Sequence, residues 1–578
     1  MPGPLVRIRA RRHRLEPWGW LTAIAVVVTG AFPSSSRAEA PLHERIDAAI
    51  EAALPQFLPN GVSPDQVLHL VDDEAFIRRV YLDVVGVVPS ADEVRAFAAD
   101  QSPDKRAKLI DQLLASDAYP RRMRELFNVM LMERRGSSPE WDKYIEQSFA
   151  ANKPWDELAK EILAGESGDD DSRQGVEFWY TKRLENYGQN PVDYDGLARD
   201  VGRLFFGVDL QCANCHNHLF IDDYKQADYK GLFLLIAGTS NLKEGNRFRL
   251  AEKPLTAKLE FSSVFDGVQM AIGPKVPGLQ EVSIPEFPEG EEYAVPPDRK
   301  TRHPGVPKFS PRRVLAEQAA ESPNFRLNAA NRLWWTVMGR GLVEPLDLSH
   351  SDNPPSHPEL LALLADELAA YDYDMRWFLR ELLRTRTYQR SSELPEGANV
   401  PPEAFAVALE KPLSAEQLTW SVLRATGNLA AMPGAEAVKL TASADQTAAK
   451  PAGDAKAQPL PKLATLQQKF ETAFANPAME PEVEFKPSVK AALFLSNDDS
   501  VLTLLQPRPG NLTDRLMAAP DAAAVAEEAY LSVLGRSPTE QEQAMVSEYL
   551  TGRADNRLQA VKNLAWALIA STEFCLNH

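Results

Sequence analysis

The chain has 578 residues, with 81 acidic and 63 basic side chains and a formal net charge of −18. This length predicts two or three domains, each with its own core, and the negative charge argues against nucleic acid or an anionic membrane as a partner. Only three cysteines occur, which excludes a fold held together by disulfides.

The first forty residues have the pattern of an export signal. Five arginines lie within residues 1–17, an apolar stretch runs from Trp18 to Phe32, and Ala38-Glu-Ala40 offers a small-residue cleavage site. This succession is typical of a signal peptide, and the apolar stretch is short for a membrane-spanning helix. We expect residues 1–40 to be removed on export, which leaves a periplasmic, cell-surface or secreted protein without a membrane span. An uncleaved N-terminal anchor is the alternative.

A pattern of helix, glycine, proline and helix occurs three times along the chain. In each copy a glycine in the left-handed conformation is expected to end one helix, and a third helix is expected to end in Ser or Thr followed three residues later by an aromatic residue. Pro89 and Pro538 each lead into a helix start with Ser or Thr and then acidic residues. The first helices end in the segments Tyr81–Gly86, Trp334–Gly339 and Tyr530–Gly535.

Residues 211–218 read Gln-Cys-Ala-Asn-Cys-His-Asn-His and hold two of the three cysteines. Cys-x-x-Cys-His is the pattern by which haem c is attached. The thiols of Cys212 and Cys215 would add to the two vinyl groups of the porphyrin, and His216 would bind the iron as proximal ligand. The motif therefore predicts covalent haem c. The export signal agrees, since bacteria attach haem c outside the cytoplasm.

The distal haem ligand is not marked by a local pattern. His218 follows His216 by two residues, so we expect it at the edge of the haem and not on the opposite face. More distant candidates are His303, His350, His357, Met270 and Met338. His357 also fits the start of a helix.

The same cluster has two other interpretations. A non-haem metal site would use Cys212, Cys215 and His218 for zinc or non-haem iron, with a fourth position open or filled from elsewhere. In the other interpretation, Cys212 and Cys215 form a disulfide in an oxidising compartment.

The rest of the sequence predicts a mainly α fold, with repeated helical modules around the Cys-x-x-Cys-His site. Alternating residues with frequent Pro and Gly predict a small β-rich insertion, with strands near 248–250, 258–261, 268–272 and 282–284. A segment rich in Ala, Pro, Lys and Asp predicts a flexible linker. The predicted divisions are the signal 1–40, a helical domain with the Cys-His motif 41–244, the insertion 245–300, a helical domain 301–432, the linker 433–462 and a C-terminal module 463–578 that repeats the N-terminal pattern.

Several segments resemble a known pair of domains. Phe76–Pro89 and Phe206–His218 are similar to the planctomycete cytochrome-c-like domain. Asn331–Trp334, Gly339–Pro345 and Asn353–Leu361 are similar to the planctomycete-specific domain associated with it. The resemblance covers nearly all of residues 45–578, and both domains are of unknown function.

The resemblance implies a cytochrome-like site at the Cys-His motif, with two departures. Asn217 and Leu219 stand where the family often has Asp and Pro. If that Asp has an electrostatic or ligand role in the family, Asn217 weakens this role in the present chain.

The first functional class is therefore electron transfer or haem-dependent redox chemistry with a redox partner. The second is an exported binding or scaffold protein, or a hydrolase, with a non-haem Cys/His metal site. No Gly-x-Ser-x-Gly, P-loop or dinucleotide fingerprint occurs. Both an enzyme and a non-catalytic electron carrier fit these motifs.

Overall fold

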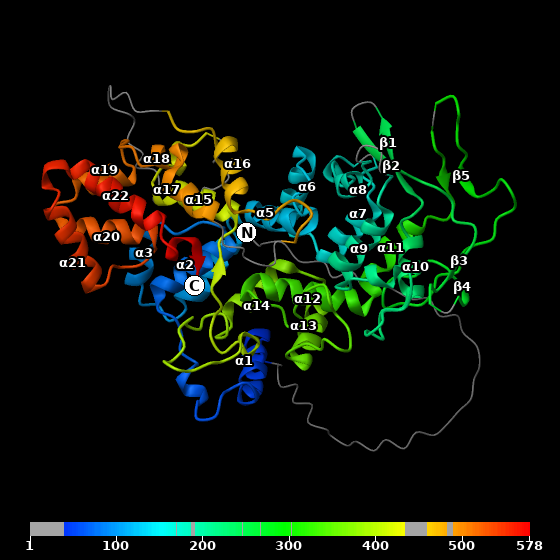
Figure 1. Cartoon of the computed structure of the whole chain (residues 1–578), viewed down its shortest axis with the longest axis horizontal. Coiled ribbons are helices and arrows are strands. Elements are labelled where there is room, and N and C mark those ends of the chain that lie inside the picture. The colour runs from blue at the N-terminus through cyan, green and yellow to red at the C-terminus, as the bar shows by residue number, and fades with distance from the viewer. Residues whose placement is uncertain are drawn as a thin grey trace, which may run out of the picture. The chain divides into compact units, whose positions relative to one another are not determined.

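Helices make up most of the structure, a computed structural model that describes residues 40–168, 170–186, 191–244, 247–265, 267–301, 303–433, 459–481 and 489–578 (Figure 1). The predicted signal up to residue 39 and most of the predicted linker, 434–458, lie outside the described residues. Residues 41–578 form one compact unit, and its predicted division into smaller domains stays a prediction. No helix in the described ranges is long and apolar enough to cross a membrane.

The prediction of a mainly helical fold is confirmed. The helices before residue 240 are α1 Leu42–Ala53, α2 Asp73–Val84, α3 Ala91–Ala99, α4 Lys105–Leu114, α5 Ala118–Met132, α6 Pro139–Ala150, α7 Trp155–Ala164, α8 Phe178–Arg183, α9 Tyr194–Phe206 and α10 Gln226–Leu234. The later helices are α11 Pro311–Gln318, α12 Pro323–Met338, α13 Pro358–Ala370, α14 Met375–Arg384, α15 Ala415–Ala425, α16 Leu463–Phe474, α17 Val489–Asn497, α18 Asp499–Leu504, α19 Leu512–Ala518, α20 Ala522–Val533, α21 Glu540–Thr551 and α22 Arg557–Ile569.

The strands form small two-stranded antiparallel sheets, three of them in and around the predicted insertion. The pairs are β1 Thr239–Glu244 with β2 Arg247–Glu252, β3 Leu259–Ser262 with β4 Gln269–Ile272, β5 Tyr293–Val295 with β6 Val306–Pro307, and β7 Lys411–Pro412 with β8 Leu576–Asn577. The strands predicted near 248–250, 258–261 and 268–272 are confirmed. The strand predicted at 282–284 is wrong, because Pro285 and Pro288 lack the amide hydrogen that a ladder requires.

The first and last copies of the repeat end their first helix in the same way. Gly86 and Gly535 have φ values of +73° and +71°. Their amides donate to the carbonyl oxygens of Tyr81 and Tyr530 at 2.9 and 3.1 Å. A capping box then starts the next helix in both copies, at Ser90 for α3 and at Thr539 for α21. The prediction that a glycine ends one helix and that Ser or Thr begins the next is confirmed at both ends of the chain.

The third helix of every copy ends in the predicted Ser/Thr-x-x-aromatic turn. The hydroxyls of Ser116, Thr385 and Ser571 each donate to the carbonyl three residues earlier, at 2.6 to 2.7 Å. The aromatic residues three positions later are buried, and they are Tyr119, Tyr388 and Phe574. The hydroxyl closes the last turn, and the aromatic side chain then enters the core.

The two terminal copies pack against each other, although more than 400 residues separate them in sequence (Figure 1). On α3, Arg95 forms ion pairs with Glu528 at 2.8 Å and Glu527 at 3.2 Å, both on α20. The guanidinium of Arg78 on α2 donates to the carbonyl oxygens of Phe574 and Leu576 at 3.1 and 3.2 Å. One hydrophobic core runs through both copies.

The matched glycines give a test of the repeat. We expect Gly86→Ala to lower the free energy of unfolding by about 2–4 kcal/mol, and Gly535→Ala by about 1–2 kcal/mol. Both substitutions place an alanine at positive φ. At Gly86 the new Cβ would also lie 2.8 Å from Cδ of Arg122, whereas at Gly535 its nearest neighbour is 3.4 Å away. Urea unfolding followed by circular dichroism measures both losses. Equal losses would contradict the tighter packing at Gly86.

Candidate functional site

The Cys-His loop, residues 211–218, follows directly from the end of α9. That helix ends at Gly207, which has a φ of +68°. The next residues are held to a second segment of the chain, since the Asp209 amide donates to the Asp347 carbonyl at 2.9 Å and the Ser349 amide donates to the Gly207 carbonyl at 3.0 Å. The loop therefore starts from a fixed point at the surface of the helical core.

The two cysteines lie on a short helical turn. Gln211–Asn214 form a 3-10 turn in which Ala213 is fully buried. Cys212 and Cys215 are free thiols and are exposed. The buried alanine anchors the turn, and both sulfur atoms remain open to addition chemistry.

The hydrogen bond of His216 fixes which of its ring nitrogens carries the proton. Nδ1 lies 2.6 Å from the backbone oxygen of Asn217. A carbonyl oxygen only accepts, so Nδ1 must be the donor. In the neutral ring Nε2 then has its lone pair free, which is the state of a metal-binding histidine with a backbone acceptor behind it.

His218 has the opposite arrangement. Its Nδ1 accepts from the amides of Ile221 at 2.9 Å and Phe220 at 3.3 Å. In the neutral ring the proton is therefore on Nε2. His218 closes a turn, which its own amide completes by donating to the Tyr224 carbonyl at 2.8 Å. To bind a metal through Nε2, it would have to give up both bonds at Nδ1.

The three ligands of the non-haem alternative are not gathered in the structure. Across the residues that the structure describes, no three His, Cys, Asp or Glu side chains are grouped so that they could hold a metal ion. Cys212, Cys215 and His218 are included in that statement.

Exposed apolar side chains lie next to the Cys-His loop. Phe220, just after the loop, is 83% exposed, and Phe265, in the turn between β3 and β4, is 66% exposed. The Phe265 ring lies 4.5 Å from the ring of His216, and the Val264 amide donates to the Cys215 carbonyl at 3.2 Å. We call this set the apolar rim, and its members are Leu219, Phe220, Val264 and Phe265. Exposed apolar surface of this kind is typical of interaction sites where it is contiguous, so the apolar rim is a candidate for one.

Asn217 has a structural role. Its side-chain oxygen accepts from the amide of Gln226, the first residue of α10, at 2.9 Å. The side chain of Gln226 donates in turn to the Asn214 carbonyl at 3.2 Å. An Asp at position 217 would accept the same bond, so this departure from the family pattern leaves the anchoring of the loop on α10 unchanged.

Comparison with known proteins places this loop in a recognised domain. Residues 45–241 match PSCyt2, a protein of unknown function (DUF1549), and residues 311–550 match PSD1, a protein of unknown function (DUF1553). The chain carries a PSCyt2 domain followed by a PSD1 domain. No curated protein and no solved structure matched it.

Three parts of the chain thus meet at the Cys-His loop. The loop itself and α10 belong to the PSCyt2 domain. Val264 and Phe265 come from the segment between the two domains, and Asp347 and Ser349 belong to the PSD1 domain. The contribution of Val264 and Phe265 is not predicted from the sequence. Two adjacent apolar residues in a predicted hairpin turn, where polar residues are usual, are the signal that marks them.

Two of the distal candidates lie on elements next to the loop. The His350 ring packs on Tyr224 at 5.5 Å, and Tyr224 packs on His218 at 6.0 Å. Met270 lies on β4, opposite Phe261 of β3, in the hairpin that carries Val264 and Phe265 of the apolar rim.

The other three candidates have different surroundings. His357 directly precedes α13, so the helix-start interpretation is confirmed, and it is buried against Phe57 and Phe405. Burial lowers the pKa of His357. Met338 ends α12, and the backbone of His303 pairs with Asp298 in an exposed turn.

Proposed function

We propose that the protein is an exported haem protein for electron transfer or haem-dependent redox chemistry, with haem c joined to Cys212 and Cys215 and with His216 as proximal ligand. The observation that carries the proposal is the bond from Nδ1 of His216 to the Asn217 carbonyl. It orients the ring and leaves Nε2 free to bind iron. The export signal supports the extracytoplasmic location that haem c attachment requires.

The apolar rim supports the same proposal. A porphyrin is a large apolar plate, and Leu219, Phe220, Val264 and Phe265 offer exposed apolar surface at the Cys-His loop. Covering this surface removes it from water, which favours binding by about 25 cal/mol for each Å² buried. When bound, haem supplies a one-electron couple whose potential depends on the axial ligands and on the polarity around the ring.

The direct test is to produce the full chain in a bacterial host that assembles c-type cytochromes. We expect the denatured protein to keep its haem on a gel and to give a c-type pyridine haemochrome, with one haem per chain. Cys212→Ser combined with Cys215→Ser should abolish both signals because no thiol is left to form a thioether. Cys575→Ser is the matched control and should keep both, since Cys575 lies at the C-terminal end, outside the Cys-His loop.

One result would overturn the proposal in favour of the non-haem metal site that the sequence also allows. Colourless protein from such a host with stoichiometric zinc or iron, which is lost in the Cys212→Ser, Cys215→Ser variant, would establish a non-haem Cys/His site.

A further inference from the structure

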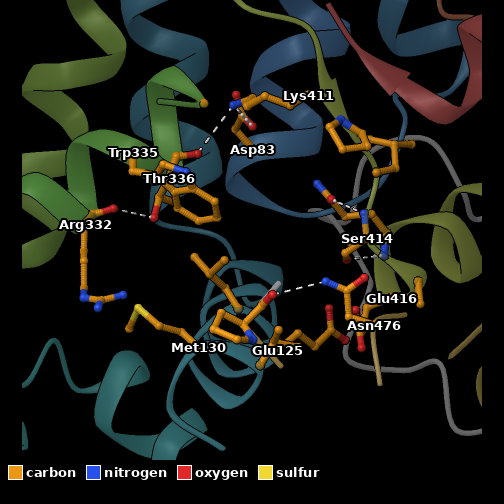
Figure 2. A pocket seen from close by; sticks show the side chains of 18 of the residues that line it. Asp83, Glu125, Met130, Arg332, Trp335, Thr336, Lys411, Ser414, Glu416 and Asn476 are labelled. Atoms are coloured by element: carbon orange, nitrogen blue, oxygen red, sulfur yellow. Dashed lines mark hydrogen bonds and ion pairs between the residues drawn. The ribbon is translucent and has the colours of Figure 1, made fainter. Parts of the chain in front are cut away.

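A cavity lies between the PSCyt2 and PSD1 domains (Figure 2). Its walls come from α5, α9 and α12, from the segment 410–417 and from residues near the end of α16. Its volume is about 220 Å³, below the roughly 300–1,000 Å³ of sites for drug-sized ligands. The cavity therefore has room for a small molecule, such as one ring with one substituent.

Part of the lining is apolar. Met130 on α5 and Trp335 on α12 face the cavity, and Figure 2 shows both side chains. Leu126 and Phe474 add further apolar surface. An occupant with an apolar body is stabilised by these walls.

Most charged groups of the lining are already neutralised by neighbours. Lys411 points toward Asp83 in Figure 2, and its Nζ lies 2.6 Å from the carboxylate. Arg203 forms ion pairs with Glu133 at 2.6 Å and Asp347 at 2.8 Å. These groups need no ligand to balance their charge.

Arg122 on α5 is the exception. Its side chain lines the cavity and is only 7% exposed. Within the described ranges, its guanidinium has no hydrogen bond or ion pair, and its Nε is fully buried. Each of the other buried arginines of these ranges donates to at least one carbonyl or carboxylate oxygen, and they are Arg78, Arg79, Arg121, Arg183, Arg203, Arg312, Arg332 and Arg390.

The stem of Arg122 is held in place by the repeat. Gly86 packs so closely on it that a Cβ at position 86 would lie 2.8 Å from the Arg122 Cδ. Burial lowers the pKa of Arg122, and the nearby carboxylates of Glu125, Asp83 and Glu416 oppose that effect. An arginine stays charged under such conditions. A buried charge without a partner is costly for a fold, so this position calls for an anion.

We propose that the cavity binds a small organic monocarboxylate, whose carboxylate pairs with Arg122 and whose apolar body lies against Met130 and Trp335. The planar guanidinium matches a carboxylate with two parallel hydrogen bonds. A monoanion is favoured over phosphate, because Asp83, Glu125 and Glu416 also line the cavity and would repel a second negative charge. This inference does not depend on haem at the Cys-His loop.

The test uses the full chain with benzoate, phenylacetate and hexanoate as probes, and with benzamide and inorganic phosphate for comparison. We expect at least one carboxylate to raise the thermal unfolding temperature and to give a calorimetric binding signal, while benzamide and phosphate do not. Arg122→Met should weaken that carboxylate about 10- to 100-fold, the value of a charge-assisted hydrogen bond. The matched control is Arg380→Met on α14, since Arg380 pairs with Asp111 and lies outside the cavity lining, and the affinity should be unchanged.

A second measurement separates a ligand site from a structural arginine. Without ligand, Arg122→Met should unfold at the same or a higher urea concentration than the natural protein, because it removes an unpaired buried charge. A marked loss of stability with unchanged carboxylate affinity would show that Arg122 pairs within the protein, and the proposal would fail. It would also fail if none of the three carboxylates binds, or if phosphate or benzamide binds as tightly. Should Arg122→Met not fold, Arg122→Lys decides by the same comparison, since lysine keeps the charge but not the planar fork.

Discussion

His216→Ala is expected to remove most of the covalently bound haem or to leave it without its proximal ligand, whereas His218→Ala is expected to keep haem in full amount. Nε2 of His216 has a free lone pair because Nδ1 donates to the Asn217 carbonyl. Nδ1 of His218 accepts two backbone amides, so this ring is engaged in the turn. The two rings are separated by one residue and are both partly exposed, which makes each variant a control for the other.

The measurement is haem per chain, from the pyridine haemochrome, together with total zinc and iron in each purified variant. With haem c, His218→Ala shifts the reduction potential at most, through the altered turn beside the haem. In a Cys2His metal site the order reverses, and His218→Ala loses the metal while His216→Ala keeps it. If both variants retain all that the natural protein binds, both models are wrong and a plain disulfide between Cys212 and Cys215 becomes the better explanation.

The repeated modules were predictable from the sequence because their signals are local. A glycine with positive φ, a capping box and a Ser/Thr-x-x-aromatic turn each depend on residues within a few positions of one another. Gly86, Gly535 and the turns at Ser116, Thr385 and Ser571 therefore stand where the sequence predicts them. The strand predicted at 282–284 does not form. Its prediction depended on alternating residues alone and did not take account of the two prolines that follow them.

The surroundings of the candidate site were not predictable in the same way. The approach of Val264 and Phe265 to the Cys-His loop depends on where a hairpin from another part of the chain packs. Arg122 is one of three arginines in α5, and only the packed structure leaves it without a partner. The spacing of Cys212, Cys215 and His216 gives the chemistry of the site, while the contacts that tell His216 from His218 come from the fold.

The largest expected loss of stability in a single variant is at Asp200 on α9. This carboxylate is 3% exposed and accepts from Arg183 at 2.7 Å, Arg135 at 2.9 Å and Arg203 at 3.1 Å. Asp200→Asn keeps the shape but removes the charge, so buried guanidinium groups lose a counter-ion. We expect the free energy of unfolding at pH 7 to fall by about 3–5 kcal/mol. Asp366→Asn is the matched control, since Asp366 pairs with Arg326 but its side chain is 72% exposed, and should cost about 0–1 kcal/mol.

The pH dependence of the loss at Asp200 tests whether charge causes it. Burial alone raises the pKa of Asp200, but Arg183, Arg135 and Arg203 together outweigh burial and hold the pKa below its ordinary value. A carboxyl with a lower pKa in the folded state stabilises the fold above the unfolded pKa of about 3.9, and this contribution is lost as the pH falls toward the folded pKa. The difference in unfolding free energy between the natural protein and Asp200→Asn should therefore be complete at pH 7 and shrink below about pH 4. Urea unfolding at pH 7 and pH 3 measures both values. A difference that stays constant would mean that the amide disturbs the packing of α9 and that the charge of Asp200 is not the cause.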